Sequence, residues 1–219
     1  MSKRIRALAE LVPSGSVLAD IGTDHGLLPI LAVEQGIVPK AYACDVAEGP
    51  LSQAEANIVQ KGLQDLVLPI LGSGFENVPE DCTSAVLAGM GFYTAVGILE
   101  EAMERLGSLE AVIVQINADV PMLRKWISDH HFTILNERTV EDRKKYYTAV
   151  VFCTKPHDAY SEMQQYAGVE EVQEDRVSWI EYLNWRRNGI QRIITLGADP
   201  AEHETELFAL NAILDRTES

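Results

Sequence analysis

Residues 17–26 read Val17-Leu18-Ala19-Asp20-Ile21-Gly22-Thr23-Asp24-His25-Gly26, a short apolar run that ends in an acid and continues into a glycine-containing turn. This order predicts a strand, a tight turn and a helix. Glycine lets the backbone approach a ligand without a Cβ atom, and a helix N-terminus offers free N–H groups. The carboxylate of Asp20 repels a pyrophosphate but attracts a cationic amino acid. The stretch therefore favours S-adenosylmethionine (SAM) over NAD as the cofactor.

The composition predicts one full-sized core and a small appendage, with 219 residues of which 47% are apolar. The net charge of −15 argues against indiscriminate binding of polyanions but leaves room for a local basic face. Three widely spaced cysteines are typical of a reducing compartment. No apolar run has the length of a membrane span, and the first residues do not read as a signal peptide. We therefore expect a cytoplasmic protein with no membrane partner, no metal site and no evident protein partner.

Seven short apolar runs are predicted strands, at residues 16–20, 40–45, 66–71, 84–88, 111–116, 132–138 and 147–154. The first five alternate with helical stretches, which is typical of a parallel α/β sheet covered on both faces. The last two are joined by the polar segment 139–145 and indicate an antiparallel hairpin. That ending is typical of the class I methyltransferase fold and not of a dinucleotide-binding Rossmann domain. We therefore expect a Rossmann-like sheet in the order 3-2-1-4-5-7-6.

A second module is predicted beyond residue 155, where the sequence changes to a linker, so the expected domains are residues 1–155 and 156–219. Residues 174–196 predict one long helix, which Gly197 is placed to end. Asp199 followed by Pro200 predicts the start of a second helix. The result is an α-helical hairpin whose packing partner the sequence leaves open. Its predicted apolar face comprises Val177, Ile180, Leu183, Ile190, Ile193, Ile194, Leu207, Leu210, Ile213 and Leu214.

Acids and glycines follow the predicted strands at one edge of the sheet, where open α/β sheets bind ligands. Asp45 ends the second strand, about twenty residues beyond the first turn, where an acid can accept hydrogen bonds from ribose hydroxyls. His25 lies on the turn, where it can meet a ligand or shape the loop. The candidate cofactor-binding residues are Asp20, Gly22, Thr23, His25, Gly26, Asp45, Val46, Gly72, Ser73, Gly74, Ala88, Gly89 and Met90.

Candidate substrate-binding residues follow the fourth and fifth strands and lie on the long helix. The amides of Gln115 and Asn117 can read the edge of a base, although Asn117 can equally cap the next helix. Phe92 can stack on a base or pack in the core. The adjacent Arg186 and Arg187 predict a phosphate clamp, or else a solvated face. Other local basic residues are Lys3, Arg4, Arg6, Arg138, Arg143, Lys144, Lys145, Arg176 and Arg192.

Several motifs together resemble the bacterial TrmK family, tRNA (adenine(22)-N1)-methyltransferases that modify an adenine of the D-loop. The matching segments are residues 2–4, 20–25, 48–51, 88–91 and 123–126, followed by the helical hairpin, so the resemblance spans nearly the whole chain. Four positions in the crevice depart from the family pattern: Leu27, Ser73, Phe92 and Ile116.

The resemblance implies a SAM-dependent enzyme that methylates N1 of adenine 22 in tRNA. Adenine N1 has a lone pair that can attack a methyl group in line, so positioning and desolvation supply most of the acceleration. The expected catalytic residues are Asp24, whose carboxylate can stabilise developing positive charge, and Asn117. Two alternatives stay open. One is a methyltransferase for another RNA or a small molecule, with the hairpin as a lid, and the other is a SAM-binding protein without catalytic activity.

Overall fold

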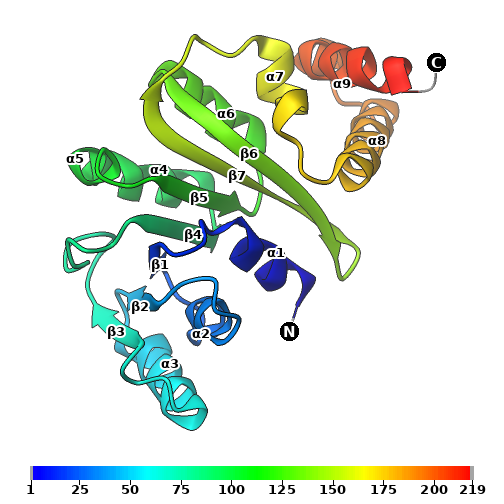
Figure 1. Ribbon diagram of the computed structural model, residues 1–219. Helices are drawn as coiled ribbons and strands as arrows, with labels where there is room; N and C mark the ends of the chain where they lie inside the picture. Colours follow the sequence, from blue (N-terminus) through cyan, green and yellow to red (C-terminus); the bar gives the residue numbers. More distant parts are fainter. Residues whose placement is uncertain (1, 218–219) are drawn as a thin grey trace.

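A seven-stranded sheet forms the centre of the computed structural model, which describes residues 2–217 (Figure 1). Its strand order is β3-β2-β1-β4-β5-β7-β6, as the sequence predicts. Strands β1 to β5 are parallel to their neighbours, whereas β7 is antiparallel to both β5 and β6. The strands are β1 (Val17–Ile21), β2 (Lys40–Asp45), β3 (Val67–Leu71), β4 (Ser84–Met90), β5 (Ala111–Ile116), β6 (Phe132–Asp142) and β7 (Lys145–Pro156).

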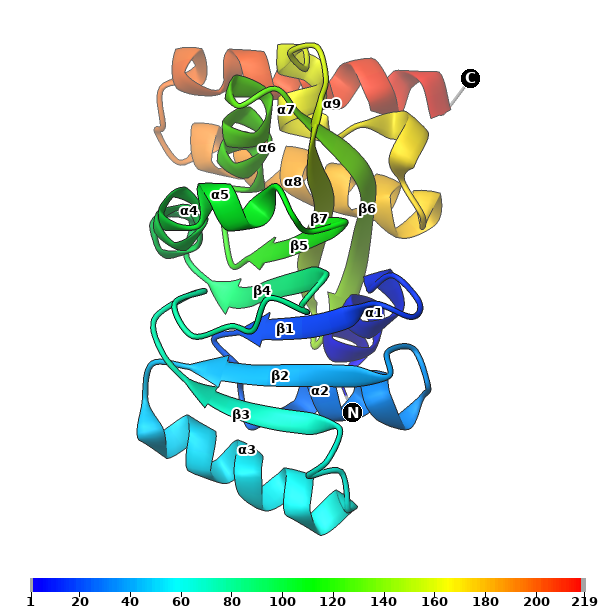
Figure 2. The same cartoon turned by 60° about the vertical axis from the view of Figure 1, so that its left-hand side comes forward.

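Helices cover both faces of this sheet (Figure 2). Helices α1, α2 and α3 pack on one face and α4, α5 and α6 on the other, each layer with its own buried apolar cluster. Burial on both faces explains why the central strands read as nearly continuous apolar runs. The helices are α1 (Lys3–Leu11), α2 (Leu27–Glu34), α3 (Glu48–Lys61), α4 (Phe92–Glu101), α5 (Met103–Leu106) and α6 (Val120–Asp129).

The β6–β7 hairpin is longer than the sequence predicts. The polar segment 139–145 is expected to be a connection, but strand pairing continues through it to Asp142 and Lys145. Only Arg143 and Lys144 form the turn, with φ of 51° and 64°, the left-handed conformation that a two-residue hairpin turn requires. Inside the ladder the buried hydroxyls of Thr139 and Thr148 share a hydrogen bond of 2.9 Å, so neither is left without a partner. Cross-strand pairing therefore turns a polar sequence into strand.

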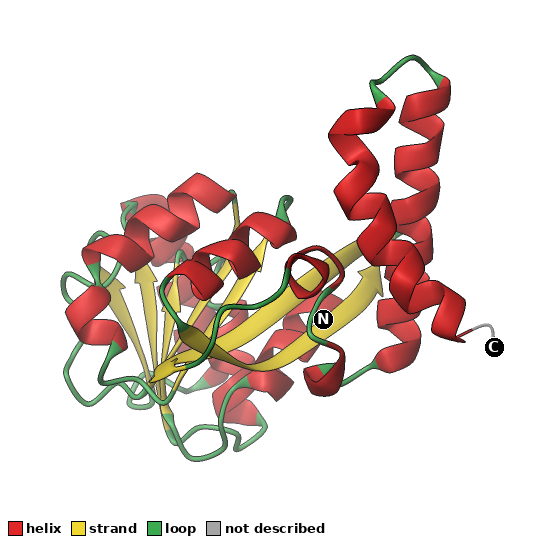
Figure 3. Ribbon diagram, turned by 90° about the horizontal axis from the view of Figure 1, so that it is seen from above, coloured by secondary structure: helices red, strands yellow, loops and turns green. Residues whose placement is uncertain are grey.

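The predicted helical hairpin is confirmed, and Figure 3 shows its two helices standing off from the sheet. Gly197, with φ of 109°, follows the first of these helices, and the Asp199 carboxylate accepts a hydrogen bond from the Ala201 N–H at 3.0 Å to begin the next turn. Within residues 2–217 no helix is both long and apolar enough to cross a membrane. The C-terminal elements are α7 (Glu162–Ala167), η1 (Glu170–Val172), α8 (Arg176–Thr195), η2 (Pro200–His203) and α9 (Glu204–Thr217).

The buried face of α8 differs from the predicted one. Val177 and Ile193 are expected to face inward, but their exposed fractions are 70% and 42%. Apolar residues occur on several sides of this helix, so periodicity alone does not identify the buried side. The side of α8 that carries aromatic residues faces inward, because burying an aromatic side chain removes more apolar area from water than burying a valine or an isoleucine. The buried residues of α8 are Trp179, Tyr182, Leu183 and Ile190.

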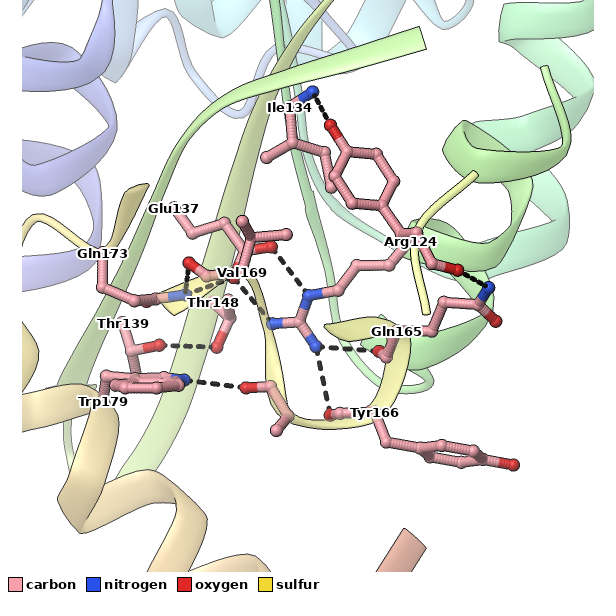
Figure 4. Close-up of polar contacts among 12 residues, drawn as sticks. Arg124, Ile134, Glu137, Thr139, Thr148, Gln165, Tyr166, Val169, Gln173 and Trp179 are labelled. Atoms are coloured by element: carbon pink, nitrogen blue, oxygen red, sulfur yellow. Dashed lines mark hydrogen bonds and ion pairs between the residues drawn. The ribbon is translucent and has the colours of Figure 1, made fainter. Parts of the chain in front are cut away.

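A buried ion pair fastens the C-terminal elements to the sheet (Figure 4). Arg124 of α6 donates two hydrogen bonds, of 2.8 and 3.0 Å, to the carboxylate of Glu137 on β6, and both side chains are fully buried. The same guanidinium donates to the carbonyl oxygens of Gln165 and Tyr166 in α7. Gln173, just beyond η1, donates to Glu137 at 2.6 Å. One charged cluster therefore holds together α6, β6, α7 and η1.

The long helix α8 is tied to the same cluster. The indole N–H of Trp179 donates to the carbonyl oxygen of Ala167 at 2.7 Å in the protein interior. Gly168 has a φ of 105°, and a Cβ atom there would lie 2.7 Å from a carboxylate oxygen of Glu137. Only glycine permits the chain to turn this close to the ion pair. The hairpin is thus seated on the protein's own α/β body.

The Arg124→Ala substitution is expected to lower the free energy of unfolding by about 3–5 kcal/mol, because it leaves the Glu137 carboxylate buried without its counter-ion. Chemical denaturation measures this loss. The neighbouring exposed pair of Lys125 and Asp129 gives a matched control. Lys125→Ala is expected to cost about 0.5 kcal/mol or less. Equal losses for the two variants would contradict a stabilising role for the buried pair.

Candidate functional site

The candidate site lies at the carboxyl ends of β1, β2 and β4. The chain passes from β1 to β2 on one side of the sheet and continues through β4 on the other side, so the topological switch point, called the crevice below, lies between β1 and β4. Ligands of open α/β sheets bind at such a switch point. The order of strands therefore brings the ends of three sequence segments, with Asp20, Asp45 and Gly89, to one edge.

Asp20 is a buried carboxylate near the carboxyl end of β1, with an exposed fraction of 5%. The Thr23 hydroxyl donates to it at 2.6 Å, and no side chain among residues 2–217 forms an ion pair with it. Burial raises the pKa of Asp20 to about 6, and the charges of Asp24 and Asp45 add to this rise while the Thr23 hydrogen bond and Arg4 oppose it. The site thus holds an acid that a bound cation can stabilise in its charged form.

The turn after β1 depends on glycine. Gly22 has a φ of 76°, and a Cβ atom there would lie 3.1 Å from the Cε of Met90. Gly26, with a φ of 69°, precedes α2, and a Cβ atom there would lie 3.2 Å from the Cβ of Ala54. The N–H groups of Gly22 and Thr23 both donate to the Cys44 carbonyl at 2.9 Å. The backbone is therefore held close to the strand ends, where an extended ligand can lie along it.

The ends of β2 and β3 continue the crevice. One oxygen of Asp45 accepts a hydrogen bond from the Ala47 N–H at 2.8 Å, and Val46 beside it has an exposed fraction of 73%. The Gly72 N–H donates to the Asp45 carbonyl at 3.0 Å, which brings the loop with Ser73 next to β2. Ser73 is exposed, and Gly74 has a φ of 53°, where a Cβ atom would lie 3.0 Å from the Cγ2 of Ile98. These residues form one open surface that can hold the nucleoside part of a cofactor.

Asn117 joins the ends of β4 and β5. Its amide donates to the Gly89 carbonyl at 2.7 Å, and its N–H donates to the Met90 carbonyl at 3.0 Å. The residue before α6 is Asp119, so Asn117 does not serve as the predicted cap. Gly89 has a φ of 81° and is exposed, whereas Ala88 and Met90 are half-buried. Asn117 thereby fixes the backbone at the β4 side of the crevice.

Gln115, near the carboxyl end of β5, has an exposed fraction of 1%. Its carbonyl oxygen accepts a hydrogen bond from Arg4 at 2.9 Å, and its amide nitrogen donates to the Ile116 carbonyl at 2.8 Å. A contact from Gln115 to a base would require these bonds to be exchanged. The guanidinium of Arg4 also lies beside Gly89 and over the Tyr147 ring. The sequence identified Arg4 only as a local basic residue and did not predict that it supports the ends of β4 and β5. Its partners are distant in sequence, and no local pattern identifies them.

The acidic end of the turn carries an Asp–His pair. The Asp24 carboxylate lies 3.1 Å from Nε2 of His25, and both side chains are exposed. His25 has a φ of 59°, and its carbonyl accepts a hydrogen bond from Asn57 at 2.9 Å. Beyond β4, Phe92 is half-buried and meets Tyr93 edge to face at 5.3 Å. Tyr93 has an exposed fraction of 81%, so it is the more accessible of these two rings.

Arg186 and Arg187 of α8 are each hydrogen-bonded to a different partner. Arg186 donates two hydrogen bonds, of 2.6 and 2.9 Å, to Glu206, and Arg187 donates to Asn184 at 2.7 Å. The sequence predicts a common site because the residues are adjacent, but neighbours along a helix do not face each other. Arg186 instead lines a hollow beside Asn117.

The four departures from the family pattern have different surroundings. Ile116 is in the core, with an exposed fraction of 2%, and Phe92 packs partly against the same core. Leu27 and Ser73 are exposed at the crevice. Two of the four changes therefore alter its accessible surface directly.

Two hollows lie near these elements. The larger, about 830 Å³, is bordered by α4, α5 and the loop after β3 and carries several glutamates, which disfavours an anionic ligand. The smaller, about 290 Å³, lies between Asn117 and the helical hairpin. No group of three or more His, Cys, Asp or Glu side chains within residues 2–217 is placed to hold a metal ion. The three cysteines are buried thiols, and burial raises the pKa of Cys44 and Cys82.

Comparison with known proteins gives consistent matches. Residues 1–150 match the family model described as a methyltransferase domain. A tRNA (adenine(22)-N(1))-methyltransferase of Bacillus subtilis is 31% identical over 160 residues, which cover 73% of this chain and 67% of that relative.

Two solved structures are similar over almost the full chain. A Streptococcus pneumoniae protein, described as a candidate tRNA (m1A22) methyltransferase and determined in complex with S-adenosyl-L-methionine, has a TM-score of 0.85 at 28% identity and covers 98% of this chain and 99% of its own. M. capricolum TrmK in complex with S-adenosyl-homocysteine has a TM-score of 0.84 at 25% identity and covers 98% of each chain. Both similarities include the C-terminal hairpin.

Proposed function

Because this chain belongs to the bacterial tRNA (adenine(22)-N1)-methyltransferase family, we propose that it transfers a methyl group from SAM to N1 of adenine 22 in tRNA. The observation that carries the proposal is the crevice at the ends of β1, β2 and β4. It combines a buried acid without a counter-ion with glycine turns that let a ligand approach the backbone. A ligand that joins a cationic amino acid to a nucleoside requires both features, a negative charge for the amino acid and a backbone that it can lie against.

We assign the cofactor site to the residues that line this crevice. When bound, SAM supplies an electrophilic methyl group on a positively charged sulfur. Asp20 can attract the cationic amino acid portion, and Asp45, with one carboxylate oxygen free of the Ala47 N–H, can accept ribose hydroxyls. The remaining candidates contribute backbone and apolar surface, namely Gly22, Thr23, His25, Gly26, Val46, Gly72, Ser73, Gly74, Ala88, Gly89 and Met90.

The target base has its own set of groups at the rim of the crevice. Adenine N1 needs no general base, because its lone pair is free to attack, so the protein has to place the base and exclude water. The Asn117 carbonyl oxygen can accept from the adenine amino group, and the ring of Phe92 or Tyr93 can stack on the base. The Asp24 carboxylate stabilises the positive charge that the base acquires. A base in folded tRNA must be turned out to reach this position.

We assign the main phosphate contacts to a basic patch formed by α1 and the β6–β7 turn. The Arg4 N–H donates to the Asp142 carboxylate at 3.3 Å, which places the two segments side by side. The patch side chains are exposed and form no ion pair with any residue in the described part of the chain. Several other basic candidates are already paired, as Arg138 is with Glu10 and Arg176 with Glu170. The patch consists of Lys3, Arg6, Arg143, Lys144 and Lys145.

The direct test is to incubate the purified protein with isotope-labelled SAM and unmodified bacterial tRNA and to identify the product nucleoside by mass spectrometry. The expected product is labelled 1-methyladenosine, because N1 is the nucleophile that the rim groups present. SAM binding is measured separately by calorimetry. Tight SAM binding with no methylated nucleoside would contradict the catalytic proposal, and a different methylated nucleoside would contradict the substrate.

Asp20→Asn is expected to affect stability and cofactor binding in opposite directions. Asp20 has a pKa of about 6 in the folded state and 3.8 when fully exposed to water, so the folded state binds the proton more tightly, and its stability falls as the pH rises from 3.8 to 6. Asparagine removes this cost but keeps an acceptor for Thr23. The cofactor-free variant should be more stable than the wild type at pH 7.5 by up to about 3 kcal/mol, with no such gain at pH 4.

The same variant should bind SAM about 10- to 100-fold more weakly at pH 7.5, because a charged hydrogen-bond partner is lost. Thermal melts and calorimetry over a pH series measure both effects. Asp81→Asn is the matched control. Tyr42 and Lys40 donate hydrogen bonds that lower the pKa of the Asp81 carboxyl, so this variant should lose stability above that pKa without a change in SAM affinity. Wild-type SAM affinity in Asp20→Asn would contradict the assignment.

A further inference from the structure

An aromatic hollow lies between the α/β body and the helical hairpin, and the cofactor site does not use it. It has a volume of about 290 Å³ and opens beside Asn117, at the carboxyl end of β5. Residues from β5, β7, α8 and α9 meet there. We call it the base groove, and it is lined principally by Asn117, Asp119, Tyr146, Tyr182, Trp185 and Arg186.

Three aromatic rings form one wall of the base groove. The Tyr146 ring centroid lies 6.0 Å from that of Tyr182 and 5.7 Å from that of Trp185, and the Tyr182 and Trp185 centroids are 6.1 Å apart. Tyr182 is buried, whereas Trp185 has an exposed fraction of 53%. The other two tryptophans of the chain are buried in apolar clusters. Trp185 therefore presents an indole surface to solvent that nothing in the described chain covers fully.

Charged groups lie beside the rings. Arg186 holds Glu206 through two hydrogen bonds, and Glu206 is buried at 8% exposure, so the pair is fixed in place. Asp119 is exposed on the body side, with a φ of 62° that is uncommon for a residue other than glycine. The groove thus combines flat aromatic surface with both donors and acceptors. These are the features that recognise an unpaired nucleobase, which has a stacking face and a polar edge.

The position of the groove identifies which base it can take. The methyl donor is expected at the ends of β1 and β4, and the acceptor atom must come within about 3.5 Å of it. The stacking wall of the groove carries Tyr146 of β7 and Trp185 of α8. It begins at β7, the second strand beyond β4, which is about 10 Å from β4 at the usual strand spacing. It is therefore too far from the donor for the reacting base but close enough for a neighbouring nucleotide.

We propose that the base groove binds one unpaired nucleobase of the tRNA substrate, adjacent in sequence to the target adenine, by stacking it on Trp185. This inference rests on the proposed function and adds a second base-binding site to it. Holding the neighbour prevents the target nucleotide from returning to its stacked position while Asn117 and the crevice hold the target. The volume, near the lower end of the range for small-ligand sites, suits a single base.

The test compares tRNA binding by the full-length wild type and by Trp185→Ala, Trp185→Phe and Phe208→Ala, all saturated with S-adenosyl-homocysteine. Trp185→Ala should weaken binding of unmodified tRNA about tenfold, because base–aromatic stacking contributes about 1–3 kcal/mol. Trp185→Phe keeps an aromatic ring and should retain most of the affinity. Phe208 is a matched control, since it is an aromatic residue of the hairpin with 73% exposure that lies outside the groove.

A second set of measurements uses tRNAs that carry an abasic nucleotide on one side or the other of the target adenine. One of these abasic tRNAs should bind the wild type more weakly than intact tRNA does. Trp185→Ala should bind that abasic tRNA with the same affinity as it binds intact tRNA, because the stacking contact is already absent. Cofactor-product affinity, measured by calorimetry, should be the same in all four proteins. Circular dichroism and thermal melting establish that the variants are folded, as expected for an exposed residue.

Two results would overturn the proposal for the groove alone. One is that Trp185→Ala binds tRNA like the wild type, and the other is that its loss of affinity is the same for every abasic tRNA. In both cases wild-type methylation of tRNA would leave the proposed function standing. If the wild type neither binds nor methylates tRNA, the groove proposal and the proposed function both fail.

Discussion

The buried pair of Arg124 and Glu137 is the interaction on which the relation between the two parts of the molecule depends. Both side chains are fully buried, and both are bonded to the segment that leads into the hairpin. An isolated pair of helices buries little apolar surface, so α8 and α9 need the sheet to hold a defined position. A buried ion pair adds little net stability compared with apolar residues but tolerates few alternative geometries. The hairpin is thereby held where its aromatic residues form one wall of the base groove.

The crevice shows a different balance between stability and function. Asp20 is buried near Asp24 and Asp45, whose negative charges add to the cost of ionising Asp20 in the cofactor-free protein. Nothing in the described chain neutralises Asp20, although Arg4 lies close enough to lower its pKa slightly. A bound cationic ligand offsets this unfavourable field, so the same charges that destabilise the empty fold contribute to the affinity of the site.

Sequence patterns identified what is encoded locally. Short apolar runs predicted the strands, the antiparallel final pair indicated the class I methyltransferase order, and the strand-end rule brought Asp20 and Asp45 to one edge. Contacts between distant segments could not be read in this way. The bond from Arg4 to Gln115 spans 111 positions, and the pairing that turns residues 139–142 into strand depends on β7. The contact of Arg186 with Glu206 could not be read from the sequence either, because helical periodicity locates a face but not the partner opposite it.

Position-resolved methylation of one tRNA transcript and its matched variant distinguishes transfer to adenine 22 from every other outcome. The transcript carries adenine at position 22, and the variant carries guanine there with the rest of the sequence unchanged. With SAM present, the protein should place one methyl group on the first transcript, at N1 of that adenine, and none on the second. Methylation of both transcripts, or of neither while SAM is bound, would contradict the account.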